Sequence, residues 1–348
     1  MTRIQQVLFE LETGYLGHPY YVTGNALFQA LAQRVDERTR RELCVSHGVF
    51  LPREYGTPRS WHSQSALGTV GGSLPPVETY DDLFLLRDAA QRWLKSSHPR
   101  DAHNVQPLQS HGGRIAVDSV TRFGRPPEMQ TSKRSVKWVV QCYLHTDTAP
   151  GSREASVLPV ADEALDRLQV GGARNYGFGQ LSVIDTQLVD LDALEYERIA
   201  AADKHVLELV SPFVLASEYP GADDQSIPWW WDVSRPVAAS SVDAGCDSNC
   251  DGEVGEARGA GLRRRSEQLV DDGEVYDLAT IDHGQLVGYD GSNPVGTAKN
   301  GVLRVGTHSR FGFGELRVRP ADDDRVPDRS VSTSDGAGAD IPRGEVEQ

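Results

Sequence analysis

Lysine is scarce in this chain of 348 residues: it supplies five of the 35 basic residues, and arginine supplies the other thirty. Acidic residues number 50, which gives a formal net charge of −15. A chain this acidic is a poor general binder of nucleic acid, because it repels polyphosphates. Many carboxylates with few lysines are typical of proteins from salt-accumulating halophiles. We therefore expect a halophile; the plainer alternative is an acidic protein from a GC-rich genome.

High salt would change the electrostatic argument. At roughly 1 M salt the Debye length is about 3 Å, so long-range repulsion and long-range attraction are both screened. Binding of RNA would then depend on short-range donors, on stacking and on shape.

Long apolar runs are also missing. The sequence contains no stretch of 18 apolar residues, which excludes a membrane-spanning helix. The opening residues MTRIQQVLFELE alternate polar with apolar side chains and lack the apolar centre of a signal peptide. We expect a first strand here, a cytoplasmic location and no membrane partner.

Cysteine is too rare to form a disulfide framework in a cytoplasmic chain, since there are only four. Cys246 and Cys250 form a C-x3-C pair, but no second pair follows them at the spacing of a zinc site. We expect no metal site and no cofactor.

Glycine, in contrast, is concentrated in two matching stretches. The first is GGARNYGFGQLSV, from Gly171 to Val183, and the second is GTHSRFGFGELRV, from Gly306 to Val318. Glycine reaches positive φ without penalty, and successive free N–H groups can bind an anion. Two copies of one pattern indicate an internal duplication. The predicted phosphate donors are the glycines Gly171, Gly172, Gly177, Gly179, Gly306, Gly312 and Gly314.

Side chains within these two stretches extend the predicted site. Arg174 and Arg310 would add charge-assisted contacts to phosphates. Tyr176 and Phe311 could stack on a base or equally belong to the core, and His308 would contact a phosphate or a base.

The pattern of strands and helices in the first half follows the order β-α-β-β-α-β of a ferredoxin-like (RRM-like) domain. With the repeated glycine stretch, we expect an α+β fold of two such domains in tandem, the second less regular. The first covers residues 1–190, with an insertion at 52–113, and ends with a helix at 161–170, the first glycine stretch and a strand. The second covers 191–320, with a helix at 192–202, a disordered insert at 237–261 and a hairpin of strands 275–281 and 285–289 around Asp-His-Gly. Residues 321–348 read as an acidic, disordered tail.

The two glycine stretches, each before a last strand, resemble the glycine-rich loop of the RAMP (repeat-associated mysterious protein) superfamily of CRISPR-associated proteins. The resemblance covers roughly residues 3–320 and does not specify a subfamily. It implies a guide-RNA-binding subunit of an antiviral effector complex, with CRISPR guide RNA and other CRISPR-associated subunits as partners. In backbone-forming members a hairpin between the middle strands projects over the RNA. The matching segment here carries Arg122, Arg125, Lys133, Arg134 and Lys137.

Two other functions stay open. The superfamily includes metal-independent endoribonucleases that process precursor guide RNA with an early histidine, often aided by a tyrosine. His18, with Tyr21 close by, occupies such a position here. The third possibility is a ferredoxin-like module that binds a small ligand or another protein and never contacts RNA.

Overall fold

The computed structural model describes residues 2–18, 21–52, 115–117, 119–123, 134–146, 157–194, 196–233 and 261–321. Almost all of the expected insertion at 52–113 lies outside these ranges, as do almost all of the expected insert at 237–261 and of the expected tail at 321–348. Within them the chain is a mixed α+β protein with antiparallel sheets, many strands and few helices.

The largest sheet has eight strands and is formed by residues 3–190, the N-terminal part. Its main path is β3-β5-β8-β1-β10-β9, and β4 and β7 also pair with β8. Every pair is antiparallel. The strands are β1 (Arg3–Leu11), β3 (Tyr21–Val22), β4 (Leu43–Val45), β5 (Gly48–Pro52), β7 (Val120–Phe123), β8 (Arg134–Thr146), β9 (Leu168–Gln169) and β10 (Gln180–Asp190).

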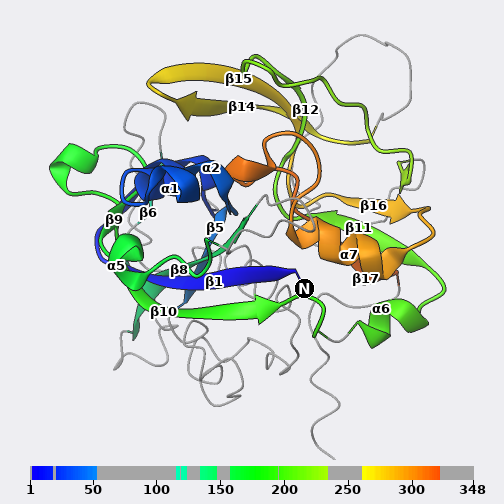
Figure 1. Ribbon diagram of the computed structural model, residues 1–348, viewed down its shortest axis with the longest axis horizontal. Helices are drawn as coiled ribbons and strands as arrows, with labels where there is room; N and C mark the ends of the chain where they lie inside the picture. The colour runs from blue at the N-terminus through cyan, green and yellow to red at the C-terminus, as the bar shows by residue number, and fades with distance from the viewer. Residues whose placement is uncertain are drawn as a thin grey trace, which may run out of the picture.

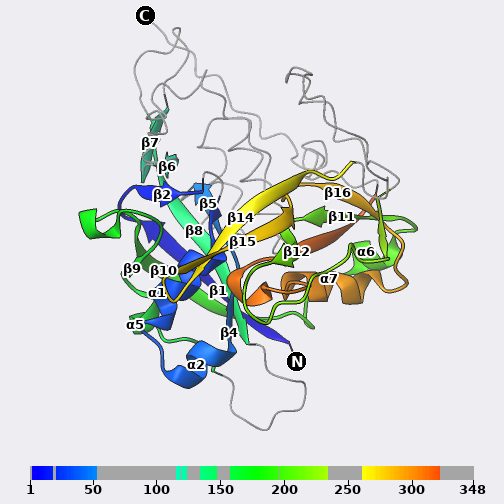
Figure 2. The same ribbon diagram turned by 90° about the horizontal axis from the view of Figure 1, so that it is seen from above.

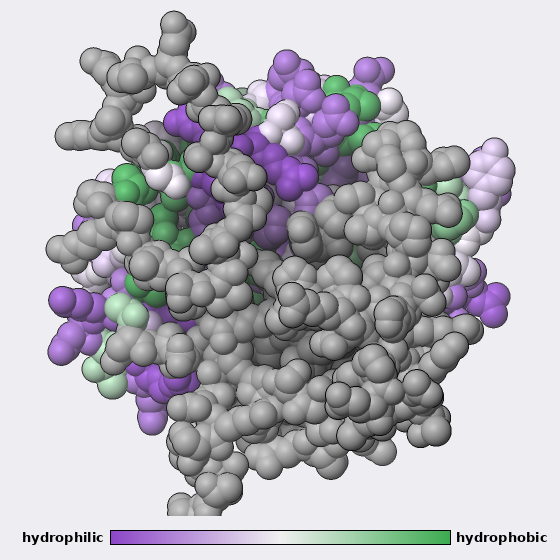
Figure 3. Space-filling model, turned by 180° about the vertical axis from the view of Figure 1, so that it is seen from behind, coloured by the Kyte–Doolittle hydropathy of each residue, from purple (hydrophilic) through white to green (hydrophobic). Residues whose placement is uncertain are grey.

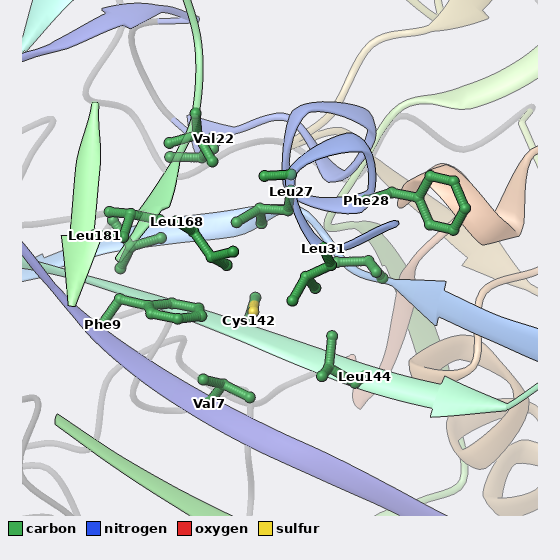
Figure 4. Packing of buried hydrophobic residues seen from close by; sticks show 14 of the residues in the cluster. Val7, Phe9, Val22, Leu27, Phe28, Leu31, Cys142, Leu144, Leu168 and Leu181 are labelled. Atoms are coloured by element: carbon green, nitrogen blue, oxygen red, sulfur yellow. The ribbon is translucent and has the colours of Figure 1, made fainter. Parts of the chain in front are cut away.

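Two helices, α1 (Gly24–Ala32) and α2 (Glu37–Glu42), lie together beside this sheet (Figure 1). Thr23 caps the start of α1, because its side chain accepts the Ala26 N–H. Leu27 and Leu31 of α1 face Phe9 of β1 and Leu144 of β8 (Figure 4). Burying each such side chain contributes about 1.5–3 kcal/mol, so this layer is the main core. A short pair, β2 (Tyr15–Gly17) and β6 (Ile115–Val117), lies apart from the large sheet.

Residues 196–321, the C-terminal part, form two further sheets. One has the order β13-β16-β11-β17 and the other β12-β15-β14. The second of these sheets lies across the top of the molecule (Figures 1 and 2). The strands are β11 (His205–Leu209), β12 (Phe213–Ser217), β13 (Trp231–Asp232), β14 (Arg264–Asp271), β15 (Glu274–Ile281), β16 (Leu286–Tyr289) and β17 (Leu316–Pro320), and α7 (Pro294–Val302) packs on β17.

The hairpin predicted around Asp-His-Gly is wrong. β15 pairs with β14 and β12, whereas β16 pairs with β11 and β13, so the turn at 282–284 passes from one sheet to the other. The hairpin in this region is formed by β14 and β15 around Asp272 and Gly273, both at positive φ, as a tight two-residue turn requires. Strand β14 was not predicted.

Two predicted helices are much shorter than the sequence indicated. The helix expected over 161–170 is only α5 (Asp162–Leu165), because Asp166 is extended and Arg167 has a φ of 54°. Leu168 then pairs with Leu181 as part of β9, so sheet pairing ended the helix. The helix expected over 192–202 is only α6 (Glu197–Ala201).

The two parts share one hydrophobic core. Buried Val214, Leu269, Leu278, Phe311 and Phe313 of the C-terminal part belong to the cluster that holds the α1 layer. We call this contact between the parts the joint. In the described residues no helix is long and apolar enough to cross a membrane.

Candidate nucleic-acid interface

The two glycine stretches form the same backbone turn at an offset of 135 residues. We call them loop 1 (Gly171–Gly179) and loop 2 (Gly306–Gly314). Each contains a 3-10 turn, at Arg174–Tyr176 in loop 1 and at Ser309–Phe311 in loop 2. Positive φ falls at equivalent positions, which in loop 1 are Gly171, Ala173, Gly177 and Gly179 and in loop 2 are Gly306, His308, Gly312 and Gly314.

The last glycine of each loop is required by close backbone approach. Val170 N–H donates to the Gly179 carbonyl at 2.9 Å, and Val305 N–H donates to the Gly314 carbonyl at 2.8 Å. A Cβ on Gly179 would lie 1.9 Å from the Val170 carbonyl oxygen, and one on Gly314 would lie 2.0 Å from that of Val305. The duplicated pattern is therefore a duplicated structure.

Several glycine N–H groups of loop 1 already have partners. Gly172 donates to the Leu16 carbonyl, Gly179 to the Gly14 carbonyl and Gly177 to the Arg174 carbonyl, at 2.7–2.9 Å. The role of phosphate donor that the sequence predicted for these three N–H groups does not fit this geometry. Gly172 and Gly179 anchor the loop to the turn and strand that follow β1, and Gly177 closes the 3-10 turn within the loop.

Loop 1 presents its side chains to solvent. Arg174, Asn175 and Gly177 are exposed, and Tyr176 is 79% exposed. An exposed tyrosine between an asparagine and a glycine, two residues from an arginine, offers an aromatic face, an amide and a guanidinium at one place. These are the groups that hold a base and its phosphate.

Loop 2 is covered by the N-terminal part, so the two loops do not form one open cradle. Its 3-10 turn packs on α1 and β4. Phe311 is 4% exposed and meets the Phe28 ring edge-on at 5.2 Å. Arg310 lies over the same ring and donates to the Arg40 carbonyl. The RNA contacts predicted for Phe311, Gly312 and Gly314 do not fit this burial, and the predicted phosphate contact of Arg310 does not fit a guanidinium that is engaged with Phe28 and Arg40.

The rest of loop 2 faces β12. Gly306 is exposed, but its α-carbon region lies against Gln225. His308 is half-buried, and its Nε2 is 3.0 Å from the Ser217 hydroxyl oxygen. Burial lowers the pKa of His308, so this imidazole is neutral near pH 7.

Part of the predicted basic hairpin can be placed. β7 and β8 pair antiparallel, with Arg122 opposite Ser135 and Phe123 opposite Arg134. Lys137 on β8 is half exposed and forms an ion pair with Glu10 of β1. Arg125 and Lys133 lie outside the described residues.

His18 and Tyr21 do come together, in a group of rings that crosses the joint. We call His18, Tyr21, His47 and His283 the ring cluster. His18 stacks on Tyr21 with ring centroids 3.8 Å apart, and His283 meets both rings edge-on at 5.8 and 5.2 Å. His47 lies 4.5 Å from Tyr21 and accepts the Gly24 N–H at its Nδ1.

The ring cluster has an unusual electrostatic setting. Burial, aided by the charges of Arg265 and His283, lowers the pKa of His18 to about 3, although Asp282 opposes the shift. Burial and the nearby Glu267 carboxylate raise the pKa of Tyr21 well above its ordinary value. At neutral pH the imidazole of His18 is therefore uncharged, and the phenol of Tyr21 is protonated.

Sequence reasoning missed His283, Asp282 and Arg265 as members of this site. Asp282 Oδ1 lies 2.9 Å from His283 Nδ1 and 4.0 Å from the Arg265 guanidinium. The only signal was the Arg263–Arg265 run and the Asp-His-Gly triplet, which are separate in sequence and meet because β15 pairs with β14.

Loop 1 and the ring cluster are linked through β2. Gly172 of loop 1 hydrogen-bonds to Leu16 of β2, and His18 follows that strand directly. The exposed loop and the histidine therefore belong to one region of the molecule.

The described residues contain no group of three or more histidine, cysteine, aspartate or glutamate side chains placed to hold a metal ion. Cys44 and Cys142 are buried, and Cys246 and Cys250 lie outside the described ranges. No family model matches this sequence, and no curated protein matches it.

Proposed function

We propose that this protein is a guide-RNA-binding subunit of a CRISPR effector complex, built from two ferredoxin-like units of the RAMP type. In a β-α-β-β-α-β unit the first strand lies between the third and the fourth, and the second strand lies outside the third. The N-terminal path β5-β8-β1-β10 and the C-terminal path β13-β16-β11-β17 both follow that order. In the second unit β12 and the loop after it stand where the first helix would be.

One observation carries the RNA proposal: the contrast between Tyr176 and Phe311. These residues occupy equivalent places in two copies of one turn, yet Phe311 is 4% exposed and Tyr176 is 79% exposed. A large aromatic ring that stays in water contributes none of the about 1.5–3 kcal/mol of stability that its burial would provide. An RNA base stacked on Tyr176, with Arg174 on the adjoining phosphate, would use that ring.

Single-stranded RNA is the form of nucleic acid that such a site accepts. A base must be unstacked from its neighbours before a tyrosine can stack on it, and stacking of this kind is worth about 1–3 kcal/mol per base. The contact is short-range, which fits a chain with a net charge of −15.

Binding of fluorescent repeat-derived RNA tests the proposal, measured in 0.3–2 M KCl for the wild type and the variant Arg174→Ala/Tyr176→Ala. The double variant should bind at least tenfold more weakly. Arg41→Ala is the matched control, because Arg41 is exposed on α2 and, among the described residues, pairs with Glu37 of its own helix. Absence of wild-type binding, or equal binding by the loop 1 variant and the control, would reject the proposal and favour a module that binds a protein or small ligand.

A second candidate function, metal-independent cleavage of precursor guide RNA, rests on the stacking of His18 on Tyr21 in the ring cluster. The setting is a poor one for this chemistry, because Tyr21 is 2% exposed and a pKa of about 3 makes His18 a weak base. Neutral His18 could accept the proton of a 2′-hydroxyl as it attacks the neighbouring phosphorus, and protonated Tyr21 could donate to the departing 5′-oxygen. The 2′-O–P bond forms and the P–O5′ bond breaks, leaving a cyclic phosphate and a 5′-hydroxyl.

Incubation of repeat RNA with the protein in EDTA separates the two functions. Cleavage that survives EDTA, disappears in His18→Ala and falls in Tyr21→Phe would establish the nuclease. Intact RNA with undiminished binding would leave the binding subunit. Tyr21→Phe keeps the ring that stacks on His18 and removes only the hydroxyl, so it separates chemistry from packing.

A further inference from the structure

The sequence of β14 begins at a run of three arginines whose side chains divide between two faces. Strand residues alternate, so Arg263 and Arg265 share a side with Glu267 and Leu269, and Arg264 lies on the other. Leu269 belongs to the core that crosses the joint, which identifies its side as the inner one. Arg264 therefore points to the outer face of the β12-β15-β14 sheet.

Arg263 and Arg265 are held in place by carboxylates that lie deeper than they do. Arg263 is 3.7 Å from Asp282, and Arg265 is 3.0 Å from Glu267 and 4.0 Å from Asp282. The two carboxylate side chains are 14–15% exposed, whereas the arginine side chains are 69% and 40% exposed. A guanidinium has five N–H donors, so one edge can be fixed by a carboxylate while another faces outward.

The two arginines adjoin the ring cluster. Arg263 and Arg265 lie 3.7 and 4.0 Å from Asp282, whose carboxylate is 2.9 Å from Nδ1 of His283 in that cluster. His18 follows β2, and β2 holds loop 1 through the Gly172 to Leu16 hydrogen bond. A series of contacts through β2, the ring cluster and Asp282 therefore connects loop 1 to β14 across the joint. The described residues at the top of the space-filling view, over the β14–β15 hairpin, are mostly hydrophilic (Figure 3).

We propose that Arg263 and Arg265 bind phosphates of the same single-stranded RNA that loop 1 holds, so that the RNA runs across the joint. This inference rests on the proposed function and assigns a second contact to it. Outward donors held by buried carboxylates fit a phosphodiester, which accepts bidentate hydrogen bonds from arginine. A short-range contact of this kind persists in salt that screens attraction at a distance.

Salt dependence of RNA binding tests the inference. The logarithm of the binding constant falls with the logarithm of salt concentration by about 0.7 for each phosphate that a protein neutralises on a single strand. In Arg263→Gln/Arg265→Gln the slope should become shallower by about 1.4, and affinity at 0.3 M KCl should fall more than tenfold. Arg264→Gln, which removes a neighbouring charge from the opposite face, should keep the wild-type slope.

Lysine variants guard against a misfolded protein. Arg263→Lys/Arg265→Lys keeps both charges beside Asp282 and Glu267, so the fold and the salt slope should be retained while affinity falls severalfold through loss of bidentate contacts. Thermal unfolding of every variant is compared with that of the wild type.

The outcomes distinguish the two proposals. If Arg174→Ala/Tyr176→Ala weakens binding but the glutamine double variant matches Arg264→Gln in slope and affinity, the contact at β14 is wrong and the proposed function stands. If the wild type does not bind RNA, or the loop 1 variant binds as the wild type does, the proposed function itself fails.

Discussion

Thr13 and Ser211 perform the same task in the two halves of the chain. The Thr13 hydroxyl accepts the N–H of Gln180 at 3.0 Å, and the Ser211 hydroxyl accepts the N–H of Glu315 at 2.8 Å. Each hydroxyl lies just after the strand that pairs with the strand following its glycine loop. The duplication thus extends from the loops to the turn that anchors them.

Ser211→Ala should destabilise the protein more than Thr13→Val does. Ser211 is fully buried, so its loss leaves the Glu315 N–H without that acceptor at a cost of about 1–3 kcal/mol. Thr13 is only half-buried, and water can replace its hydroxyl, so we expect less than 1 kcal/mol. Urea denaturation of both variants measures the difference, and equal losses would contradict it.

Gly314→Ala should cost about 3 kcal/mol of unfolding free energy. The new methyl group would meet the Val305 carbonyl oxygen at 2.0 Å, and the residue would keep a φ of 80°. Gly177→Ala is the matched control: its φ is 83°, but a Cβ there meets nothing within 4 Å. The control should lose only about 1 kcal/mol. Similar losses would show that the close approach is not what requires glycine.

Phe311→Ala should destabilise the protein far more than Tyr176→Ala does. Removing buried Phe311 opens a cavity beside Phe28 and should cost about 3–5 kcal/mol. Removing exposed Tyr176 should change the unfolding free energy by less than about 0.5 kcal/mol. Chemical denaturation of both variants checks this contrast, and a large loss in Tyr176→Ala would mean that its ring packs on the protein.

The sequence predicted those features that local residues determine. Four glycines within nine residues of loop 1 predicted a loop with left-handed backbone. The pairing of the first and last strands also followed from the expected strand order. Each of these depends on residues close in sequence or on a pattern that repeats.

Features set by distant residues could not be predicted. Tyr176 and Phe311 occupy one pattern, and the positions of the distant Phe28 and Tyr219 decide that the second aromatic is buried. The Asp-His-Gly turn was interpreted as a hairpin because β14, the strand that pairs with β15, was not predicted. That arginine-rich strand follows directly after the expected insert at 237–261. The contact between His283 and His18 therefore could not be predicted, because strand pairing brings the two residues together.

The last prediction concerns acid, and it follows from a buried contact at the joint. Arg304 donates to His145 Nδ1 at 2.5 Å, so the imidazole must be neutral; burial, followed by the charge of Arg304, lowers its pKa well below 6.5. Below about pH 6.5 the unfolded chain binds a proton that the folded chain does not. Stability should therefore fall by about 1.4 kcal/mol for each further pH unit, until the folded pKa is reached.

His145→Gln keeps an oxygen acceptor for Arg304 without titrating. Urea denaturation at pH 7.5 and pH 5 should show a smaller acid loss in His145→Gln than in the wild type, whereas equal losses would place the acid sensitivity in His18 and His308 instead.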